Sequence, residues 1–274
     1  MVLERLYSSS YIKKHKPITL LLGIAYAICG ISFALFLFPD NPAPMSIAFI
    51  SLFAAVSLSD LLIFRENIKQ KNRRSLQEFF KENKDILFIL SYLFIGILFT
   101  FAFFSIFMPT LTTNQIFSGQ VNMMHTLSAK NIFDFGRFNS IFSNNLKVLL
   151  VCIFTSFLFG ISTIFLLILI WNASVIGVIF GLAAKNSVTT QNPFFYFLFI
   201  LIAALPHIGL EISSYLFAGV VGDKFSQLIY LKGIFSSKGV LTGIMLFLLL
   251  SFILLILAAI VETAVTPHII KLFL

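Results

Sequence analysis

The chain has 274 residues, of which 59% are hydrophobic and only 11% are charged. A water-soluble domain carries about 25% charged residues, so this composition excludes a chain whose surface mostly faces water. The formal net charge of +8 is therefore interpreted as loop charge that sets membrane topology, and not as a surface for nucleic acid. Both cysteines, Cys29 and Cys152, lie inside apolar runs, which argues against a disulfide framework or a zinc ribbon.

Two apolar runs and a basic linker make up the first 85 residues. A membrane-spanning helix needs roughly 20 apolar residues, and residues 18–38 form the first such run. No small-residue cleavage pattern follows it, so we interpret it as a retained span and not as a signal peptide. A turn rich in Pro and Asn leads to the second run, 45–64, and a polar linker covers 65–85. We expect residues 1–85 to form an N-terminal unit, separate from a membrane domain over 86–274.

The next predicted span covers residues 86–108 and ends before Pro109. Residues 110–145 are too polar to cross a bilayer, because Gln, Asn, His and Lys interrupt their apolar residues. Apolar pairs such as Ile116-Phe117 nevertheless recur in this segment. We therefore predict short helices there that lie on the membrane surface.

Three further spans are predicted over residues 146–171, 194–221 and 240–263. The apolar piece 173–184 is short for a span, and Asn172 is the expected helix break before it. We predict that this piece is a re-entrant half-helix, because irregular backbone at that depth is tolerated only inside protein or beside a water-filled cavity. The predicted fold is thus an all-α, polytopic transmembrane bundle with six spans plus one re-entrant half-helix. Seven spans result if 173–184 crosses the membrane.

Basic residues predict the orientation. Most Lys and Arg residues lie in the segment before the first span and in the 65–85 linker. Two spans separate these segments, so both face the same side of the membrane. The positive-inside rule assigns that side to the cytoplasm. We therefore expect a multi-pass protein of the cell membrane with a cytoplasmic N-terminus.

Ionisable residues inside spans are costly and mark candidate functional positions. His207 and Glu211 are four residues apart, so they share one helix face, and Pro206 predicts a kink beside them. Glu262 near the end of the last span and Asn172 at the expected helix break complete a candidate intramembrane polar site. A hydrogen bond between His207 and Glu211 explains the pair structurally. A proton relay, a polar ligand site and metal coordination are the functional alternatives.

Other chemical signatures are missing from the sequence. It contains no HExxH zinc pair, no phosphate-binding loop and no GxSxG nucleophile elbow. An intramembrane hydrolase that uses His207 lacks an evident nucleophile and a second histidine ligand. We therefore predict no enzymatic activity, no catalytic residue, no metal site and no cofactor. Small residues such as Gly219 and Gly222 are interpreted as sites of close helix packing.

Ordered motifs from about residue 86 to the C-terminus resemble the stage II sporulation protein M family of integral membrane proteins. The matching stretches are IFSNNLKVLL, WNASVIG, LPHIGLEISS, AGVVG and AAIVETAVTP. Ala173 and Ile208 depart from the glycines that are usual in the family, and Gly209 is displaced by one position. The resemblance implies that the motif residues define a shared fold; besides the four polar residues these are Asn144, Asn145, Gly160, Gly177, Pro206, Gly219, Gly222, Thr266 and Pro267.

The resemblance also implies a protein without catalytic activity. The member of this family that acts in sporulation looks like a membrane scaffold that localises cell-wall-degrading partners. We therefore predict a non-catalytic scaffold or assembly subunit of a cell-envelope complex, with membrane lipid and other proteins as partners and no nucleic acid. The alternative is a transporter or permease, because a half-helix that meets a kinked helix is typical of transporter binding sites.

Overall fold

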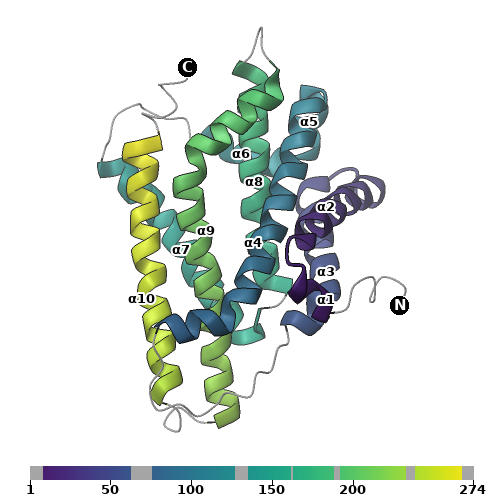
Figure 1. Ribbon diagram of the computed structural model, residues 1–274. Helices are drawn as coiled ribbons and strands as arrows, with labels where there is room; N and C mark the ends of the chain where they lie inside the picture. Colours follow the sequence, from purple (N-terminus) through teal and green to yellow (C-terminus); the bar gives the residue numbers. More distant parts are fainter. Residues whose placement is uncertain are drawn as a thin grey trace.

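The computed structural model describes residues 9–62, 76–126, 135–161, 163–187, 192–232 and 238–266, and all regular structure in these ranges is helical (Figure 1). Pro267 lies outside the described residues. The helices are α1 (Ser9–Lys14), α2 (Ile18–Leu37), α3 (Pro42–Leu62), α4 (Leu76–Phe107), α5 (Thr110–Ile116), α6 (Ser118–Thr126), α7 (Phe135–Phe159), α8 (Thr163–Ser187), α9 (Pro193–Lys232), α10 (Lys238–Ile260) and the π-helix η3 (Val261–Val265).

Six helices are long and apolar enough to cross a membrane, namely α2, α4, α7, α8, α9 and α10. A seventh helix, α3, is apolar over the shorter stretch Pro42–Leu58. The predicted all-α polytopic bundle is therefore confirmed. These six helices are not the six predicted spans. The predicted span 146–171 is divided between α7 and α8, which are two separate candidate spans, and the predicted span 45–64 corresponds to the shorter apolar helix α3.

The predicted re-entrant half-helix over 173–184 is wrong. Helix α8 runs without interruption from Thr163 to Ser187, so Asn172 lies inside it and marks no break. The chain instead turns at Gly160, whose φ of +69° is left-handed, a conformation that residues with a Cβ rarely adopt. This turn divides the apolar run 146–171 between α7 and α8.

Helices α5 and α6 are short, as predicted, and they pack against the bundle; their position at the membrane surface stays a prediction. Phe117, between them, is fully buried, and its ring centroid lies 5.2 Å from that of Phe101 in α4. In α6, the buried Gln120 amide donates a 3.1 Å hydrogen bond to Ser174 Oγ in α8. Ser174 lies about three helical turns, ~16 Å, before Lys185, which is near the end of α8. Gln120 therefore contacts α8 well inside its length. The two short helices thus pack back against α4 and α8.

The ends of the helices fall into two groups (Figure 1). The start of α4 lies beside the first half of α10, because the ring centroids of Phe79 in α4 and Phe247 in α10 are 4.6 Å apart. At the opposite end, Lys185 of α8 donates a hydrogen bond to the carbonyl of Met108 just after α4. The end of α9 and the start of α10 therefore lie on the same side as the start of α4, and the end of α8 lies on the other side.

Glycines permit the closest helix approaches in the bundle. A Cβ added at Gly177 of α8 would lie 2.5 Å from the carbonyl oxygen of Leu98 in α4. One added at Gly23 of α2 would lie 2.6 Å from the carbonyl oxygen of Leu93, on the same helix α4. Small residues allow such contacts, which add dispersion energy between helices that lipid surrounds. Helix α4 is therefore the central element, with α2 and α8 packed against it.

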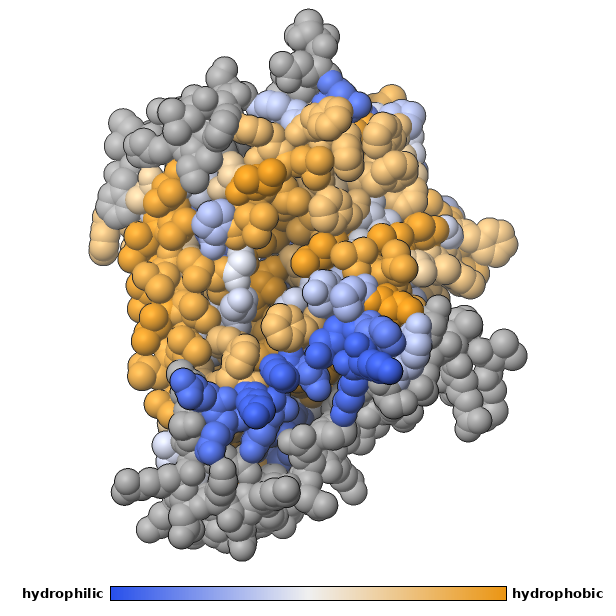
Figure 2. Space-filling view, viewed as in Figure 1, coloured by the Kyte–Doolittle hydropathy of each residue, from blue (hydrophilic) through white to orange (hydrophobic). Residues whose placement is uncertain are grey.

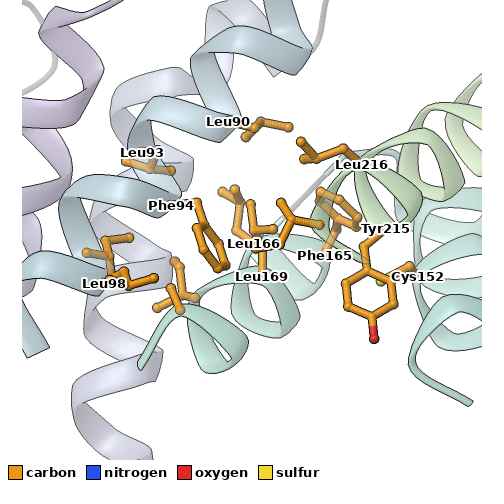
Figure 3. Packing of buried hydrophobic residues seen from close by; sticks show 14 of the residues in the cluster. Leu90, Leu93, Phe94, Leu98, Cys152, Phe165, Leu166, Leu169, Tyr215 and Leu216 are labelled. Atoms are coloured by element: carbon orange, nitrogen blue, oxygen red, sulfur yellow. The ribbon is translucent and has the colours of Figure 1, made fainter. Parts of the chain in front are cut away.

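Apolar side chains fill the space between the central helices and also cover the outside. Figure 3 shows the interior, where residues of four helices meet; the labelled ones are Leu90, Leu93, Phe94, Leu98, Cys152, Phe165, Leu166, Leu169, Tyr215 and Leu216. On the outside, large apolar residues such as Phe36, Phe154 and Leu249 are exposed. Figure 2 shows a mostly apolar surface with a hydrophilic band toward one end. This surface suits contact with lipid.

Substitution of Gly96 by Ala should destabilise the bundle. A Cβ at Gly96 in α4 would collide with the carbonyl oxygen of Leu20 in α2, and backbone atoms cannot move aside cheaply. We expect the free energy of unfolding in detergent to fall by about 1–3 kcal/mol, measured by thermal unfolding of the purified protein. The matched control is Gly209→Ala, because no atom lies within 4 Å of a Cβ there; this variant should retain the stability of the parent protein.

The arrangement of helix ends predicts the labelling of single cysteines in a background that lacks Cys29 and Cys152. Cysteines at Glu82 in α4 and Lys238 in α10 should react with a membrane-impermeant maleimide from one side. Cysteines at Asn139 in α7 and Asn186 in α8 should react from the other side. Labelling of Glu82 and Lys238 from opposite sides would contradict the arrangement of α9 and α10.

Candidate functional site

Helix α9 carries three polar side chains in one row. His207, Glu211 and Tyr215 follow one another at intervals of four residues, so they share one face of a helix. Apolar residues surround them in the sequence, and α9 continues through Pro206 as one helix from Pro193 to Lys232. Figure 1 shows that α9 bends along its length, as the loss of one backbone hydrogen bond at a proline allows.

The imidazole of His207 is hydrogen-bonded to the last described residue of the final span. His207 is 8% exposed, and its Nδ1 lies 2.9 Å from Thr266 Oγ1. Thr266 directly follows the π-helix η3, a rare element that often occurs at functional sites. This bond joins the middle of α9 to the end of α10 across 59 residues of sequence.

The carboxyl group of Glu211 accepts a hydrogen bond within its own helix. Tyr215 donates from its hydroxyl to Glu211 Oε1 over 2.9 Å. Glu262 of η3 is near enough to interact electrostatically with Glu211, and Arg137 at the start of α7 interacts in the same way with Glu262. Three helices therefore contribute ionisable groups to one region, which we call the α7–α9–α10 cluster: Arg137, His207, Glu211, Tyr215, Glu262 and Thr266.

The cluster differs from the predicted site in two respects. The expected hydrogen bond between His207 and Glu211 is not formed, because Thr266 and Tyr215 are their respective partners. Asn172 donates to the carbonyl of Ile168 in its own helix α8, and no hydrogen bond joins it to the cluster within the described ranges. The polar chemistry thus gathers where α7, α9 and α10 meet.

The turn between α7 and α8 is held by α9. The carboxylate of Asp223 accepts a hydrogen bond from the backbone N–H of Ile161, and its Oδ2 accepts another from Gln227 Nε2 over 2.8 Å. A Cβ at Gly160 would lie 3.1 Å from Asp223 Oδ1. Asp223 therefore satisfies the backbone N–H of Ile161 in the turn that precedes α8.

The motif glycines lie at helix contacts. A Cβ at Gly219 would lie 2.6 Å from the ring of Phe165 in α8. One at Gly222 would collide with the carbonyl oxygen of Ile153 in α7. Gly177 contacts α4 as described above. These glycines bring α9 and α8 close to their neighbours, as the packing interpretation of the sequence expected.

The remaining motif residues have different surroundings. Asn145 of α7 is buried, whereas Pro206 is exposed on the surface of α9. Asn144 Nδ2 donates a weak 3.4 Å hydrogen bond to Asn145 Oδ1. Since the proline ring faces outward, Pro206 influences the cluster through the shape of α9 and not through contact.

Sequence reasoning missed Tyr215, Arg137 and Asp223. Tyr215 was detectable, because it continues the four-residue spacing of His207 and Glu211 along α9. Arg137 belongs to a segment expected to lie on the membrane surface, and the partner of Asp223 lies more than sixty residues earlier in the chain. Nothing local in the sequence indicates either contact.

The chemistry available to the cluster is hydrogen bonding and proton exchange. Within the part of the chain that the structure describes, no group of three or more His, Cys, Asp or Glu side chains could hold a metal ion. Two carboxyl groups, an imidazole, two hydroxyls and a guanidinium remain. All of them can donate, accept or, apart from the guanidinium, exchange protons.

The comparison with protein families gives a match over most of the chain. The family model described as "Stage II sporulation protein M" matches residues 91–267, which include the whole cluster and all motif positions. The match begins inside α4, so α2 and α3 precede it. No curated protein and no solved structure matches the chain.

The substitution Thr266→Val should destabilise the contact between α9 and α10. It replaces the hydroxyl by a methyl group of similar size and leaves the buried His207 Nδ1 without its partner. We expect a loss of about 1–3 kcal/mol in the free energy of unfolding, measured as a lower melting temperature in detergent. Thr110→Val, at an exposed position of α5, is the matched control and should change stability little.

The substitution Tyr215→Phe tests the second hydrogen bond of the cluster. It removes only the hydroxyl that donates to Glu211 and keeps the buried ring. The melting temperature should fall by an amount that corresponds to about 1–2 kcal/mol. Tyr92→Phe in α4 is the matched control, and an equal effect in both variants would contradict a specific role for the Tyr215 hydroxyl.

Proposed function

We propose that this chain, which belongs to the stage II sporulation protein M family, is a non-catalytic membrane scaffold or assembly subunit of a cell-envelope complex. One observation carries the proposal: the motif glycines lie at the helix contacts of a closely packed bundle. Gly177, Gly219 and Gly222 each approach a neighbouring helix more closely than any side chain would allow. A motif of this kind specifies a rigid shape, which a scaffold requires, and needs no reacting group.

Two surfaces are candidates for partner contact. The first lies at the start of α4, in the basic segment 65–85, where Lys81 is exposed and Lys84 is half-buried. The second is the first two turns of α7, where Asn139 and Ser140 are exposed. Helices α5 and α6 contribute little surface for partner contact, because their buried residues already contact α4 and α8.

The orientation is part of the proposal. We assign the end with the start of α4 to the cytoplasm, because Lys and Arg accumulate there and the positive-inside rule applies to short loops. The end of α9 and the start of α10 then face the cytoplasm as well, and the start of α7 faces the opposite side. Partners bound at Asn139 would belong to the outer compartment, whereas those bound at Lys81 would be cytoplasmic.

A transporter is the second candidate. The α7–α9–α10 cluster favours it, because ionisable groups inside a bundle often mark ion or substrate pathways. The bend of α9 beside His207 adds to this support, since interrupted helices line many transporter sites. A transporter, unlike a scaffold, requires that solute flux depend on the cluster.

Site-specific photo-crosslinking in intact cells tests the scaffold. A photoreactive residue at Lys81 or at Asn139 should give a discrete crosslinked complex with another envelope protein. The matched control is Leu249, an exposed apolar residue of α10, which should crosslink to lipid only. Equal protein crosslinking at all three positions, or none at Lys81 and Asn139, would contradict the scaffold.

Solute flux into proteoliposomes tests the transporter. The protein with Glu211→Gln should lose all flux if the cluster is a transport site. Under the scaffold proposal, neither the parent protein nor the variant drives flux, and crosslinking at Lys81 and Asn139 is unchanged by the substitution.

A further inference from the structure

The charged start of α4 lies at the level of the lipid headgroups. Helix α4 has 32 residues and is therefore about 48 Å long, whereas the hydrocarbon of a bilayer is only about 30 Å thick. Its apolar part, from Ile86 to Phe107, is about 33 Å long and matches that thickness. Five of the nine residues in 77–85 are charged. The hydrocarbon thus ends near Asp85, and the charged turns before it lie among the headgroups.

Helix α1 lies at the same level. It precedes α2, whose 20 residues begin at Ile18 and are enough to cross the hydrocarbon. Between α1 and α2, Lys16 Nζ lies 2.9 Å from Asp85 Oδ1 of α4. At the start of α2, Thr19 Oγ1 donates a 3.2 Å hydrogen bond to the carbonyl of Ile89. These contacts hold the α1–α2 junction beside α4, so the lysines of both elements share one headgroup layer.

Both elements bury an apolar side chain and turn lysines outward. Ile12 of α1 is 2% exposed, and Phe79 of α4 is fully buried. In contrast, Lys14 and Lys81 are exposed and Lys84 is half-buried. Figure 2 shows a hydrophilic band over the start of α4, directly beside the apolar surface. The lysines at this level, which we call the α1–α4 basic surface, are Lys13, Lys14, Lys16, Lys81 and Lys84.

The order of groups along α4 matches that of a phospholipid. Lys81, Lys84 and Phe88 follow one another at intervals of three and four residues, so they share one helix face. Phe88 is 46% exposed and lies on the hydrocarbon side of the two lysines. A phospholipid likewise has a charged phosphate at its outer end and apolar acyl chains inside. Lys81 lies farther from the hydrocarbon than Lys84, where it stays accessible to the protein partner of the proposed scaffold.

The sign of the charge selects an anionic lipid. The five lysines of the α1–α4 basic surface face three acidic residues of α4, which are Glu78, Glu82 and Asp85. The sequence outside the described residues does not reverse this balance. Residues 1–8 contain one acidic and one basic residue, and residues 63–75 contain one acidic and five basic residues. Clusters of Lys and Arg beside a membrane-spanning helix attract anionic headgroups.

We propose that the α1–α4 basic surface binds the phosphate headgroup of an anionic phospholipid, whose acyl chain lies along Phe88. The site goes beyond the scaffold role and does not rest on it, because it requires lipid and no protein partner. Lys14 of α1 and Lys84 of α4 contact the phosphate from two elements that the Lys16–Asp85 pair holds together.

Native mass spectrometry of the purified full chain tests the site. The chain, in a neutral detergent, is titrated with phosphatidylglycerol or with phosphatidylcholine of identical acyl chains, and the Kd of the first bound lipid is measured. The wild type should bind phosphatidylglycerol more tightly. In the double variant Lys14→Gln, Lys84→Gln, this Kd should rise about fivefold for each lysine, which corresponds to about 1 kcal/mol per lysine. The Kd for phosphatidylcholine should stay the same.

Two control variants separate charge at this surface from net charge. Lys147→Gln removes one exposed lysine of α7 and should leave both Kd values unchanged. Lys14→Arg together with Lys84→Arg keeps the charges and should keep the preference for phosphatidylglycerol. If the double glutamine variant does not fold, Lys14→Gln alone, at an exposed position, should still raise the Kd about fivefold.

Four results would overturn the proposal. The first is an equal Kd for both lipids in the wild type. The second is an unchanged Kd for phosphatidylglycerol in the glutamine variants, and the third is an equal rise in Lys147→Gln. The fourth is displacement of phosphatidylglycerol by an equal concentration of glycerol phosphate, because this compound carries the phosphate without acyl chains and would identify a site for free phosphate.

Discussion

Close approach of helix backbones to α4 is the constraint on which this bundle depends. Inside hydrocarbon, apolar side chains gain little by leaving lipid for protein, so helices associate mainly through close packing. Gly23 and Gly177 allow α2 and α8 to reach the backbone of α4. The short helices α5 and α6 then fill the space that α4 and α8 leave at one end, where Phe117 and Gln120 are fully buried.

The turn at Gly160 determines how the second half of the chain is used. Because α7 ends there, residues 163–187 form a complete helix, and α8 can run parallel to α4 over the contacts at Gly177 and Gly181. Asp223 of α9 holds the turn through the backbone N–H of Ile161. One left-handed residue and one carboxylate on a distant helix thus fix the turn that separates α7 from α8.

The polar cluster follows from that order of spans. With α7, α9 and α10 adjacent, Arg137, Glu211 and Glu262 meet although they are spread over half of the chain. The hydrogen bond between His207 and Thr266 links two helices at the point where η3 widens the helical repeat. The bundle therefore combines glycine contacts between closely packed helices with one polar region. The proposed scaffold uses the packed frame.

Composition and hydropathy by themselves determined that this protein is an all-α, polytopic membrane protein, and approximately where α2, α3, α4 and α10 lie. The four-residue spacing of His207 and Glu211 placed them on one face, and the ordered motifs indicated the family. Only the tertiary structure decided the break at Gly160, the burial of α5 and α6, and the partners of His207 and Glu211. The physical reason is that hydropathy sums over neighbouring residues, and it therefore finds a long apolar run but not a turn within it. A left-handed glycine, a buried amide such as Gln120 and the hydrogen bond between His207 and Thr266 each depend on residues that are distant in sequence. These residues come close only once the helices have packed.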